Sequence, residues 1–391
     1  MEGKDLILIN TLRMLSIDMV EKANSGHPGL PLGAAPLIYT IFSRHLRFNP
    51  KNPNWFDRDR FILSAGHGSA LLYSALFLFG YDLTLDDLKN FRQLGGKTPG
   101  HPEFGVVPGV EATTGPLGQG FAMGVGMALA ERFIEKQFSN EIINHFTYSI
   151  VSDGDLMEGI SSEAASFAGH HGLGKLIYLY DSNQITIEGK TEITFTEDIL
   201  KKFQAFGWQT LEVSDGNDIE AISKAIEEGK KEKNKPTLIK VNTHIGYGSP
   251  KQDSADCHGA PLGNENVKKT KEYFQWPVDK DFYVPEEVVE FQKLSIERGI
   301  QLENEWNEKL EKLKKTDKER YSAFLRQIAG ELPDKFQDSI SVFKEEAKGI
   351  ATRSASGKVL NSMAEILPNL IGGSADLAPS NKTDFKNNPE R

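Results

Sequence analysis

Two strand-like segments on either side of one helix decide the fold: HFTYSIVSDGD at residues 145–155 and LIYLYDSN at residues 176–183. Each is an apolar run that is too short for a helix and ends in polar residues, whereas residues 159–171 between them have a helical pattern. A strand, a helix and a second strand in this order predict two parallel strands joined by a crossover. In such sheets ligands collect at the carboxyl ends of the strands.

The same alternation continues on both sides of this unit. The strands that we predict are residues 60–63, 145–151, 176–180, 208–213 and 237–241. The helical patterns are residues 4–22, 34–44, 118–137, 159–171 and 218–230, with Pro28, Gly29 and Pro31 predicted to separate the first two. We therefore expect an α/β fold, a doubly wound parallel sheet with helices on both faces.

The composition changes after this region. From about residue 264 the chain is rich in Lys and Glu, and Trp306, Leu310 and Leu313 have helical spacing. Residues 351–365 are then predicted to be helical, and residues 369–377 resemble a strand that enters a Gly-rich loop. We expect a first domain at 1–280, a helical linker at 281–345 and the start of a second α/β domain at 346–391, which is too short to close its own sheet.

Charge and composition exclude several classes of protein. The chain has 391 residues, 45 basic and 55 acidic, and a net charge of −10, which argues against nucleic-acid binding or membrane-surface binding through general positive charge. Its single cysteine, Cys257, permits no intrachain disulfide, and the N-terminus lacks a signal-peptide pattern. The most apolar stretch, residues 70–81, is too short to span a bilayer. We expect a cytoplasmic protein.

A Gly-rich segment, TTGPLGQG at residues 113–120, leads into one predicted helix. Glycines at a helix start allow backbone N–H groups to approach an anion, which the helix dipole also favours. Such a segment is equally typical of close helix packing.

Polar residues follow the two central strands at the point where each strand ends. Asp153 follows the first strand and Asn183 the second, so both oxygen ligands meet at one edge of the sheet, the ligand type that Mg²⁺ or Ca²⁺ prefers. Gly154 leaves room for a diphosphate. The alternative is that Asp153 caps a helix and Asn183 forms a turn. The occurrence of both residues, one βαβ unit apart, favours the metal site.

Five of the nine histidines lie in loops rich in Gly and Pro: His27, His67, His101, His244 and His258. Imidazoles brought together in this way can hydrogen-bond a polyhydroxylated substrate and transfer protons near neutral pH. For any one of them, an ordinary turn histidine is an equal alternative. Zinc is disfavoured, because none of the five is spaced i, i+3 or i, i+4 from another and the cysteine has no partner.

Ten motifs in a fixed order identify a family resemblance. They are SGHPG, SAGHGS, TPGHPE, GVEATTGPLGQG, SDGDLMEGISSEA, DSNQITIEG, HIGYGS, CHGAPLG, IATRSASG and IGGSADLAPSN. The chain resembles the transketolases, which depend on thiamine diphosphate. The resemblance implies the thiamine-diphosphate-binding fold, with residues 1–280 as the diphosphate-binding (PP) domain and 346–391 as part of the pyrimidine-binding (Pyr) domain.

The resemblance also implies roles for matching positions. The metal, Mg²⁺ or Ca²⁺, would be held by Asp153, Asn183 and the carbonyl of Ile185. Thiamine diphosphate would be contacted by His67, Gly115, Leu117, Gly154, Glu158, Asn183, Ile187, Ile245 and His258. The catalytic residues would be His27, His67, His101 and His258. The sugar phosphate would meet His27, His101, His258, Arg353, Asp376 and Ser380.

The implied activity is reversible transfer of a two-carbon ketol unit from a ketose phosphate to an aldose phosphate, a step of the non-oxidative pentose phosphate pathway. Family members form the site between two subunits, with Glu158 at the interface, so a homodimer is expected. Dihydroxyacetone synthase activity stays open as a related alternative. A Rossmann dehydrogenase is disfavoured, because no strand–GxGxxG–helix opens the sheet.

Two small departures and one large one distinguish this sequence from the family pattern. Ser152 stands where Gly is usual, and Asp256 and Cys257 stand where Gly and Val are common. The family continues past Arg391 to an essential glutamate that hydrogen-bonds the aminopyrimidine ring. We therefore expect this chain alone to be incomplete, and the rival to an active enzyme is a cofactor-binding half that needs a complementing C-terminal polypeptide.

Overall fold

The computed structural model describes residues 3–334, 336–345, 348–374 and 376–387. They form two compact units, one that ends at Glu308 and one that begins at Lys309. The boundary falls inside the stretch expected to be a helical linker. Each unit is described by itself below.

The first unit is built on one parallel sheet of five strands. The strands are β1 (Arg60–Leu63), β2 (Thr147–Ser152), β3 (Leu176–Ser182), β4 (Gln209–Val213) and β5 (Thr237–Asn242). Their spatial order is β1-β2-β3-β5-β4, and every neighbouring pair is parallel. The register pairs Ser152 at the end of β2 with Asp181 near the end of β3, so the segments that follow these strands leave the sheet at one edge. The predicted parallel α/β sheet is confirmed.

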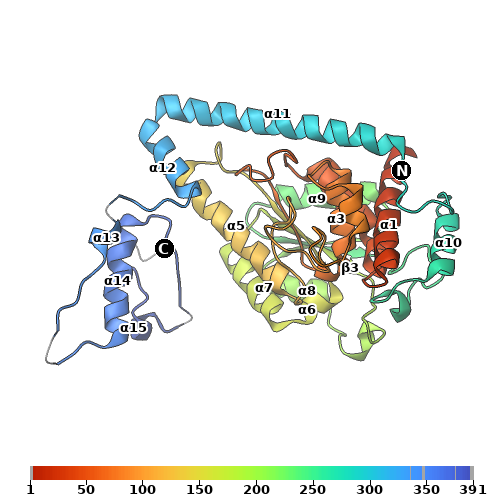
Figure 1. Cartoon of the computed structure of the whole chain (residues 1–391). Coiled ribbons are helices and arrows are strands. Elements are labelled where there is room, and N and C mark those ends of the chain that lie inside the picture. The colour runs from red at the N-terminus through yellow and green to blue at the C-terminus, as the bar shows by residue number, and fades with distance from the viewer. Residues whose placement is uncertain (1–2, 335, 346–347, 375, 388–391) are drawn as a thin grey trace. The chain divides into compact units, whose positions relative to one another are not determined.

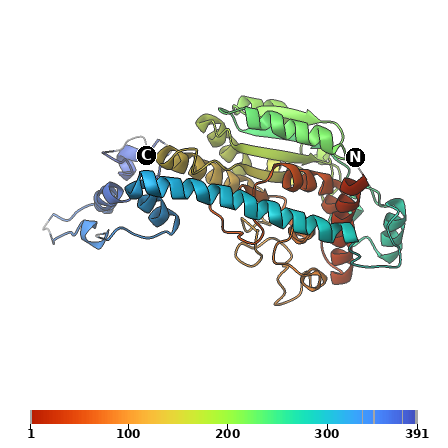
Figure 2. The same cartoon turned by 90° about the horizontal axis from the view of Figure 1, so that it is seen from above.

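Helices cover both faces of this sheet, as Figures 1 and 2 show. Alternate residues of each strand point to opposite faces. Ile177 and Leu179 belong to the core packed by α1 (Gly3–Ala23), α2 (Gly29–Thr40), α3 (Ser69–Leu78) and α9 (Ile219–Lys231). Leu176 and Tyr178 belong to the core packed by α5 (Gln119–Phe138), α7 (Gly159–His171) and α8 (Ile199–Ala205). Strands with two buried faces explain their continuous apolar runs.

Shorter elements and long helices complete the chain. In the first unit they are η1 (Ile41–His45), η2 (Gly66–Gly68), α4 (Leu85–Lys89), α6 (Asp153–Met157), η3 (Thr191–Ile193), η4 (Ala255–Cys257) and α10 (Asn264–Tyr273). α11 (Glu286–Thr316) begins in the first unit, where Gln292 donates to the carbonyl of Phe77 at 2.7 Å and Trp306 to that of Ile142 at 2.7 Å. The second unit contains α12 (Lys318–Ile328), α13 (Phe336–Ser339), α14 (Thr352–Ile366) and α15 (Ala378–Asn381).

Two local predictions are wrong. The second helix begins at Gly29 rather than after Pro31, because a proline in the first turn of a helix removes no intrahelical hydrogen bond. The helix then continues as a π-helical turn, in which the N–H of Leu46 donates to the carbonyl of Ile41 at 2.8 Å. The predicted strand at 369–377 is not formed by the described residues of that stretch. The described part of the second unit contains no strand with which it could pair, and a lone strand is not stable.

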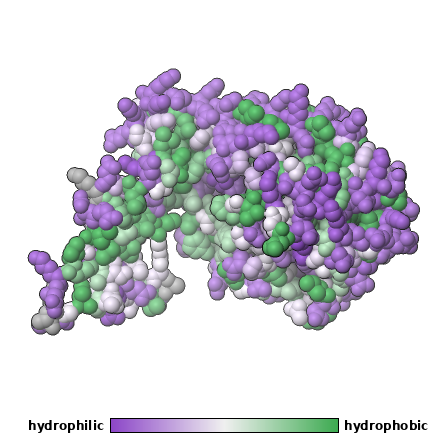
Figure 3. All heavy atoms as spheres, viewed as in Figure 1, coloured by the Kyte–Doolittle hydropathy of each residue, from purple (hydrophilic) through white to green (hydrophobic). Residues whose placement is uncertain are grey.

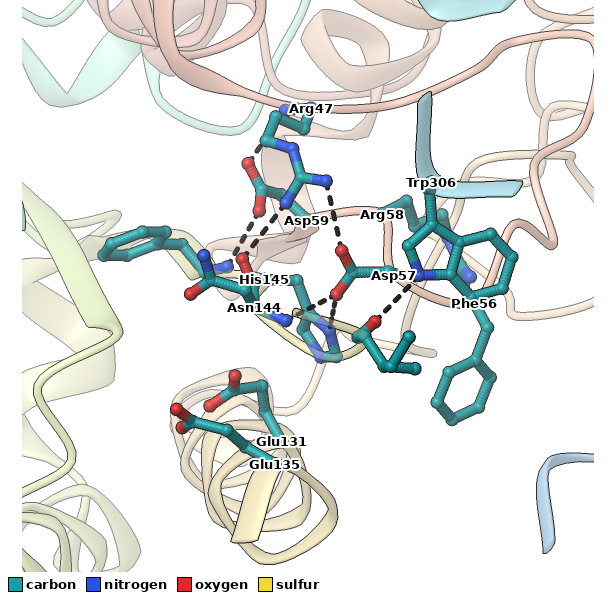
Figure 4. Close-up of polar contacts among 12 residues, drawn as sticks. Arg47, Phe56, Asp57, Arg58, Asp59, Glu131, Glu135, Asn144, His145 and Trp306 are labelled. Carbon is teal, nitrogen blue, oxygen red and sulfur yellow. Dashed lines mark hydrogen bonds and ion pairs between the residues drawn. The ribbon is translucent and has the colours of Figure 1, made fainter. Parts of the chain in front are cut away.

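Charged and titratable side chains form a cluster at the amino edge of the sheet, which we call the amino-edge cluster: the half-buried Arg47 and the buried Asp57, Asp59 and His145 (Figure 4). Asp57 accepts hydrogen bonds from Arg47 at 3.1 Å and from the N–H of Asn144 at 2.7 Å, and lies 3.3 Å from Nδ1 of His145. Asp59 accepts from the N–H groups of Arg47 and Phe146, both at 2.8 Å. Every carboxylate oxygen of the cluster therefore has a donor.

Polar residues dominate the surface. In the view of Figure 3, hydrophilic side chains cover most of the visible surface of the first unit. Among the residues that the structure describes, no helix combines the length and the apolar character needed to cross a membrane.

Candidate functional site

A cavity of about 670 Å³ lies at the carboxyl edge of the sheet, beyond the ends of β2 and β3. Its walls come from loops of the first unit together with the end of β2 and residues of α6 and η2. It is lined by His27, His67, His101, Gly115, Leu117, Ser152, Asp153, Gly154, Met157, Asn183, Ile185, Thr186, Ile187, Glu188, Lys190, Ile193, Thr194 and His258. Residues predicted separately from the glycine, carboxylate and histidine patterns therefore line one cavity.

Four of the five loop histidines face one another here. The ring centroid of His27 lies 5.2 Å from that of His67, 6.2 Å from His101 and 6.0 Å from His258. The rings of His67 and His258 are stacked at 5.1 Å. The fifth, His244, lies outside this group and pairs with Asp253 at 3.0 Å.

Two hydroxyl side chains of α3 fix the loop that carries His101. Ser69 donates to the carbonyl of Gly100 at 2.7 Å, and the hydroxyl of Tyr73 donates to that of His101 at 3.1 Å. Gly115, with φ of +141°, lies against the ring, because a Cβ there would be 3.2 Å from Cγ of His101. The glycine of the TTGPLGQG segment is thus required both by its backbone conformation and by the imidazole beside it.

Burial keeps these imidazoles neutral. Burial, together with the neighbouring His258, Arg92 and His101, lowers the pKa of His27 to about 4. It also lowers the pKa values of His67 and His101. A neutral imidazole has one N–H donor and one acceptor nitrogen, so the group can both donate to and accept from hydroxyl groups at neutral pH.

Asp153 and Asn183 lie at the floor of the cavity, as predicted for the ends of two adjacent strands. Asp153 accepts hydrogen bonds from the hydroxyl of Tyr180 and from the N–H of Gln184, the latter at 3.2 Å. The amide of Asn183 donates to Asp181 at 3.0 Å, and its oxygen accepts from the N–H of Ile185 at 3.0 Å. The backbone N–H groups of Gln184 and Ile185 therefore hold these two side chains in place.

The donor set suits a divalent cation. Asp153 is only 4% exposed, and among the described residues no Lys or Arg side chain forms an ion pair with it. Burial raises its pKa, as expected for a carboxylate that lacks a cation. No group of three or more His, Cys, Asp or Glu side chains in the described part is placed to hold a metal. A metal here would therefore use a mixed set of carboxylate, amide and carbonyl oxygens.

The walls suit a ligand that is part ionic and part apolar. Gly154 opens the floor, since a Cβ there would lie 3.0 Å from the side chain of Leu117. Leu117 and Ile187 are 36% and 67% exposed and present apolar surface to the cavity. Nδ1 of His258 is buried and has no hydrogen-bond partner among the described residues, so a ligand could satisfy this polar atom.

Sequence reasoning missed Asp155, which organises the floor. It is fully buried and accepts from Ser64 at 2.9 Å, from the N–H of Gly118 at 2.8 Å and from the N–H of Ser152 at 3.0 Å. It thereby connects the end of β1, the start of α5 and the end of β2. Its motif SDGD contains a second acidic residue, which was the available signal.

Sequence reasoning also missed most of the segment between β3 and α8. Residues 186–194 form one wall, and within them the N–H of Thr186 donates to the carbonyl of Gly189 at 2.7 Å. Lys190 and Glu188 bring both signs of charge to this wall. The polar composition of the segment did not distinguish it from an ordinary surface loop.

Two predicted site residues of the first unit do not line the cavity. Ile245 is buried with its side chain against Gly29, and Glu158 is exposed at the start of α7. Arg353 in α14, Asp376 with φ of +68° and Ser380 in α15 are exposed residues of the second unit.

Comparison with known proteins identifies the family that this chain matches. Residues 4–333 match the family model described as "Transketolase, thiamine diphosphate binding domain". The chain is 56% identical over 385 residues to the transketolase of Geobacillus stearothermophilus, covering 97% of this chain and 58% of that protein. It is 52% identical over 389 residues to that of Aquifex aeolicus, covering 98% of this chain and 55% of that protein.

Solved structures agree. A transketolase from Pichia stipitis in complex with sedoheptulose 7-phosphate superposes with a TM-score of 0.95 at 46% identity, covering 98% of this chain and 57% of that one. The Campylobacter jejuni transketolase gives a TM-score of 0.91 at 46% identity, covering 99% of this chain and 59% of that one. The chain thus spans a little more than half the length of these relatives. It belongs to the transketolase family and contains the thiamine diphosphate binding domain of that family.

Proposed function

We propose that this chain forms the diphosphate-binding part of a transketolase that transfers a two-carbon ketol unit between sugar phosphates. The observation that carries the proposal is that four imidazoles and the buried carboxylate of Asp153, which has no Lys or Arg partner among the described residues, line the same cavity. The likeness to transketolases supports the same assignment, and one of those relatives was solved with sedoheptulose 7-phosphate.

The cofactor and metal would be held at the floor. Asp153, Asn183 and the carbonyl of Ile185 would bind Mg²⁺ or Ca²⁺, with Gly154 and His67 beside the diphosphate. Gly115 and Leu117 would contact the aminopyrimidine, Ile187 and Ile245 would supply apolar walls, and Glu158 would lie at a subunit interface. Bound thiamine diphosphate supplies the carbanion chemistry by which the ketol unit is carried.

The imidazoles would transfer protons to and from the substrate. A neutral N–H of His27, His101 or His258 can donate to a sugar hydroxyl, while an acceptor nitrogen can take the proton of another. Since burial opposes their protonation, the rings would return each proton rather than retain it. Arg353 and Ser380 would bind the phosphate of the sugar, and Asp376 would face the substrate.

The whole enzyme is proposed to be a cytoplasmic homodimer in the pentose phosphate pathway. Because the relatives are longer than this chain, turnover is proposed to require polypeptide that corresponds to the rest of a relative, supplied by the same chain or by a partner. The second candidate is a module that binds the cofactor but does not turn over alone. Ile187 and Leu117, apolar and exposed at the cavity, favour a covering partner.

Two measurements test the proposal. Calorimetry of thiamine diphosphate with Mg²⁺ should show binding to this chain that is lost without the metal. Ketol transfer from sedoheptulose 7-phosphate to an aldose phosphate is then measured with and without a polypeptide that completes the relatives' length. We expect turnover in the completed protein and a decrease of roughly 10²-fold or more in His101→Ala.

His170, exposed on α7 and outside the cavity, supplies the matched control, and His170→Ala should leave turnover unchanged. No metal-dependent binding of thiamine diphosphate by the chain would contradict the proposal. Wild-type turnover in His101→Ala would contradict the role in turnover that is proposed for the histidines.

A further inference from the structure

Arg92 is a charged residue beside the cavity that the proposed function does not use. One end of its guanidinium, Nη1, donates to Oγ of Ser25 at 3.0 Å. The other, Nη2, lies 3.5 Å from Nδ1 of His27 and 3.4 Å from the carbonyl of Gly100. Arg92 therefore bridges the loop that carries His27 and the loop that carries His101.

The backbone at Arg92 is adapted to this side chain. Its φ is +59°, in the left-handed region that favours glycine, and its N–H donates to the carbonyl of Thr98 at 2.9 Å. An arginine in a conformation that glycine would adopt without strain indicates that the side chain is needed there. Gly100 makes room for it, since a Cβ at this position would lie 3.2 Å from Nε of Arg92.

The chemistry of the contact fixes the protonation of His27. A guanidinium has five N–H donors and no acceptor. Nδ1 of His27 faces such a donor and must therefore be the acceptor nitrogen, which leaves the proton on Nε2. Nε2 lies at the opposite end of the ring, on the side of Gly259, where a Cβ would be 3.5 Å away.

We propose that Arg92 is a positioning residue that holds His27 as the neutral Nε2–H tautomer, with its donor directed away from the arginine and available to substrate. The charged and titratable groups that face His27 are Arg92 and the rings of His67, His101 and His258. Arg92 is the one permanent charge among these four. The role in catalysis rests on the proposed function, whereas the tautomer does not.

The test uses the whole 391-residue chain labelled with ¹⁵N-histidine, without cofactor. Long-range ¹H–¹⁵N spectra report which ring nitrogen carries the proton, and His27→Gln identifies the signals of His27. In the wild type we expect a single Nε2–H tautomer from neutral pH down to the pKa of about 4.

Variants of Arg92 and Gly100 distinguish the effect of the positive charge of Arg92 from its support of the two loops. Arg92→Gln should mix the tautomers and raise the pKa of His27 by roughly 0.5 or more, because it removes a nearby positive charge. Arg92→Lys keeps the charge and a donor, and should retain both the tautomer and the low pKa. Gly100→Ala should displace the guanidinium and give a weaker version of the Arg92→Gln result.

Arg132→Gln is the matched control, because Arg132 contacts the carbonyl of His171 far from His27 in the sequence and lowers the pKa of His171 instead. It should leave the signals of His27 unchanged. An unchanged tautomer and pKa of His27 in Arg92→Gln would overturn the proposal, and so would equal changes in Arg92→Gln and Arg92→Lys. If Arg92→Gln does not fold, Gly100→Ala and Arg92→Lys decide by the same criteria.

The result is independent of the cofactor. Failure to bind thiamine diphosphate, with the expected response of His27, would reject the proposed function and leave the positioning role intact. The opposite pattern, binding and turnover with no response of His27, would reject the positioning role alone.

Discussion

The two edges of the sheet use the same residue types in opposite ways. At the amino edge, Asp57 and Asp59 are each 2% exposed, and Arg47 and backbone N–H groups satisfy them. At the carboxyl edge, Asp153 is 4% exposed, yet its donors in the described part of the chain are the hydroxyl of Tyr180 and backbone N–H groups, with no Lys or Arg among them. Burial alone therefore does not distinguish a functional carboxylate from a structural one.

The two edges differ in whether the buried imidazole beside the carboxylates has a hydrogen-bond partner for its Nδ1. Among the described residues, Nδ1 of His258 at the carboxyl edge is buried without a hydrogen-bond partner, whereas Nδ1 of His145 at the amino edge faces Asp57 at 3.3 Å. At the amino edge a buried hydroxyl, that of Thr147 at the start of β2, also lacks a partner in the described part of the chain, but it lies outside the amino-edge cluster. A buried group with incomplete partners costs stability unless a ligand completes it. The amino edge should therefore govern stability, and the carboxyl edge should govern binding.

The largest effect is expected for Asp57→Ala. It leaves the N–H of Asn144 and the ring of His145 without their acceptor and removes one acceptor of Arg47, so we expect a loss of about 3 kcal/mol of stability from these unsatisfied groups. Urea unfolding measures the loss. Asp57→Asn, which keeps the shape, should lose less. A loss below about 1 kcal/mol, or a parallel loss of cofactor affinity, would contradict the division between the edges.

Asp153→Ala should give the reverse pattern. The affinity for thiamine diphosphate with Mg²⁺ should decrease by about 10²-fold, because a ligand to the metal is lost. The free energy of unfolding without cofactor should stay the same or increase, since a buried carboxylate without a cation is removed. Calorimetry and unfolding are done on the same variant. Unchanged affinity would show that Asp153 is structural.

The pH dependence of stability should show a further contribution of the amino edge, from His145. Burial, together with the charge of Arg60, lowers the pKa of His145 to about 4. Between pH 6.5 and 4 the unfolded chain therefore binds a proton that the folded chain does not, and the wild type loses stability as the pH decreases. Relative to His145→Gln, we expect the wild type to lose about 2 kcal/mol over this range. A constant difference between the two would contradict this.

Ser64→Ala should have the smallest effect. Ser64 is one of several donors to Asp155, which lies at the carboxyl edge but has partners like those of the amino edge. Loss of one hydrogen bond to a carboxylate should cost about 1–2 kcal/mol of stability. Thermal unfolding measures it, with Ser223→Ala, at the other side of the unit beside His45, as a comparison. A loss of cofactor affinity without a loss of stability would place Ser64 in the binding site.

The sequence was sufficient for the sheet because the central strands β2 and β3 are buried along their whole length and the strands are separated by helical patterns of a different period. It was sufficient for the cavity floor because Asp153 and Asn183 each follow a strand, and parallel strands end at one edge. The histidines were predicted as a set, and the structure separates His244 from the other four.

The roles of Asp155 and Arg92 could not be predicted, because they depend on contacts between residues that are distant in the sequence. Asp155 has its role because Ser64 and Gly118, distant in the sequence, point their donors at it. Arg92 meets His27 only through the folding of two loops onto each other. The predicted strand at 369–377 shows the opposite case, since β propensity without a neighbouring strand does not give a strand.

The strand order has a consequence for the order of folding. β4 is an edge strand that pairs only with β5, and β5 follows it in the sequence while lying between β3 and β4 in space. As the chain leaves the ribosome, Gln209–Val213 has no partner until Thr237–Asn242 has been made. An unpaired strand is a site of aggregation. The charged and polar side chains of Gln209, Thr210 and Glu212 then protect the nascent chain during that interval.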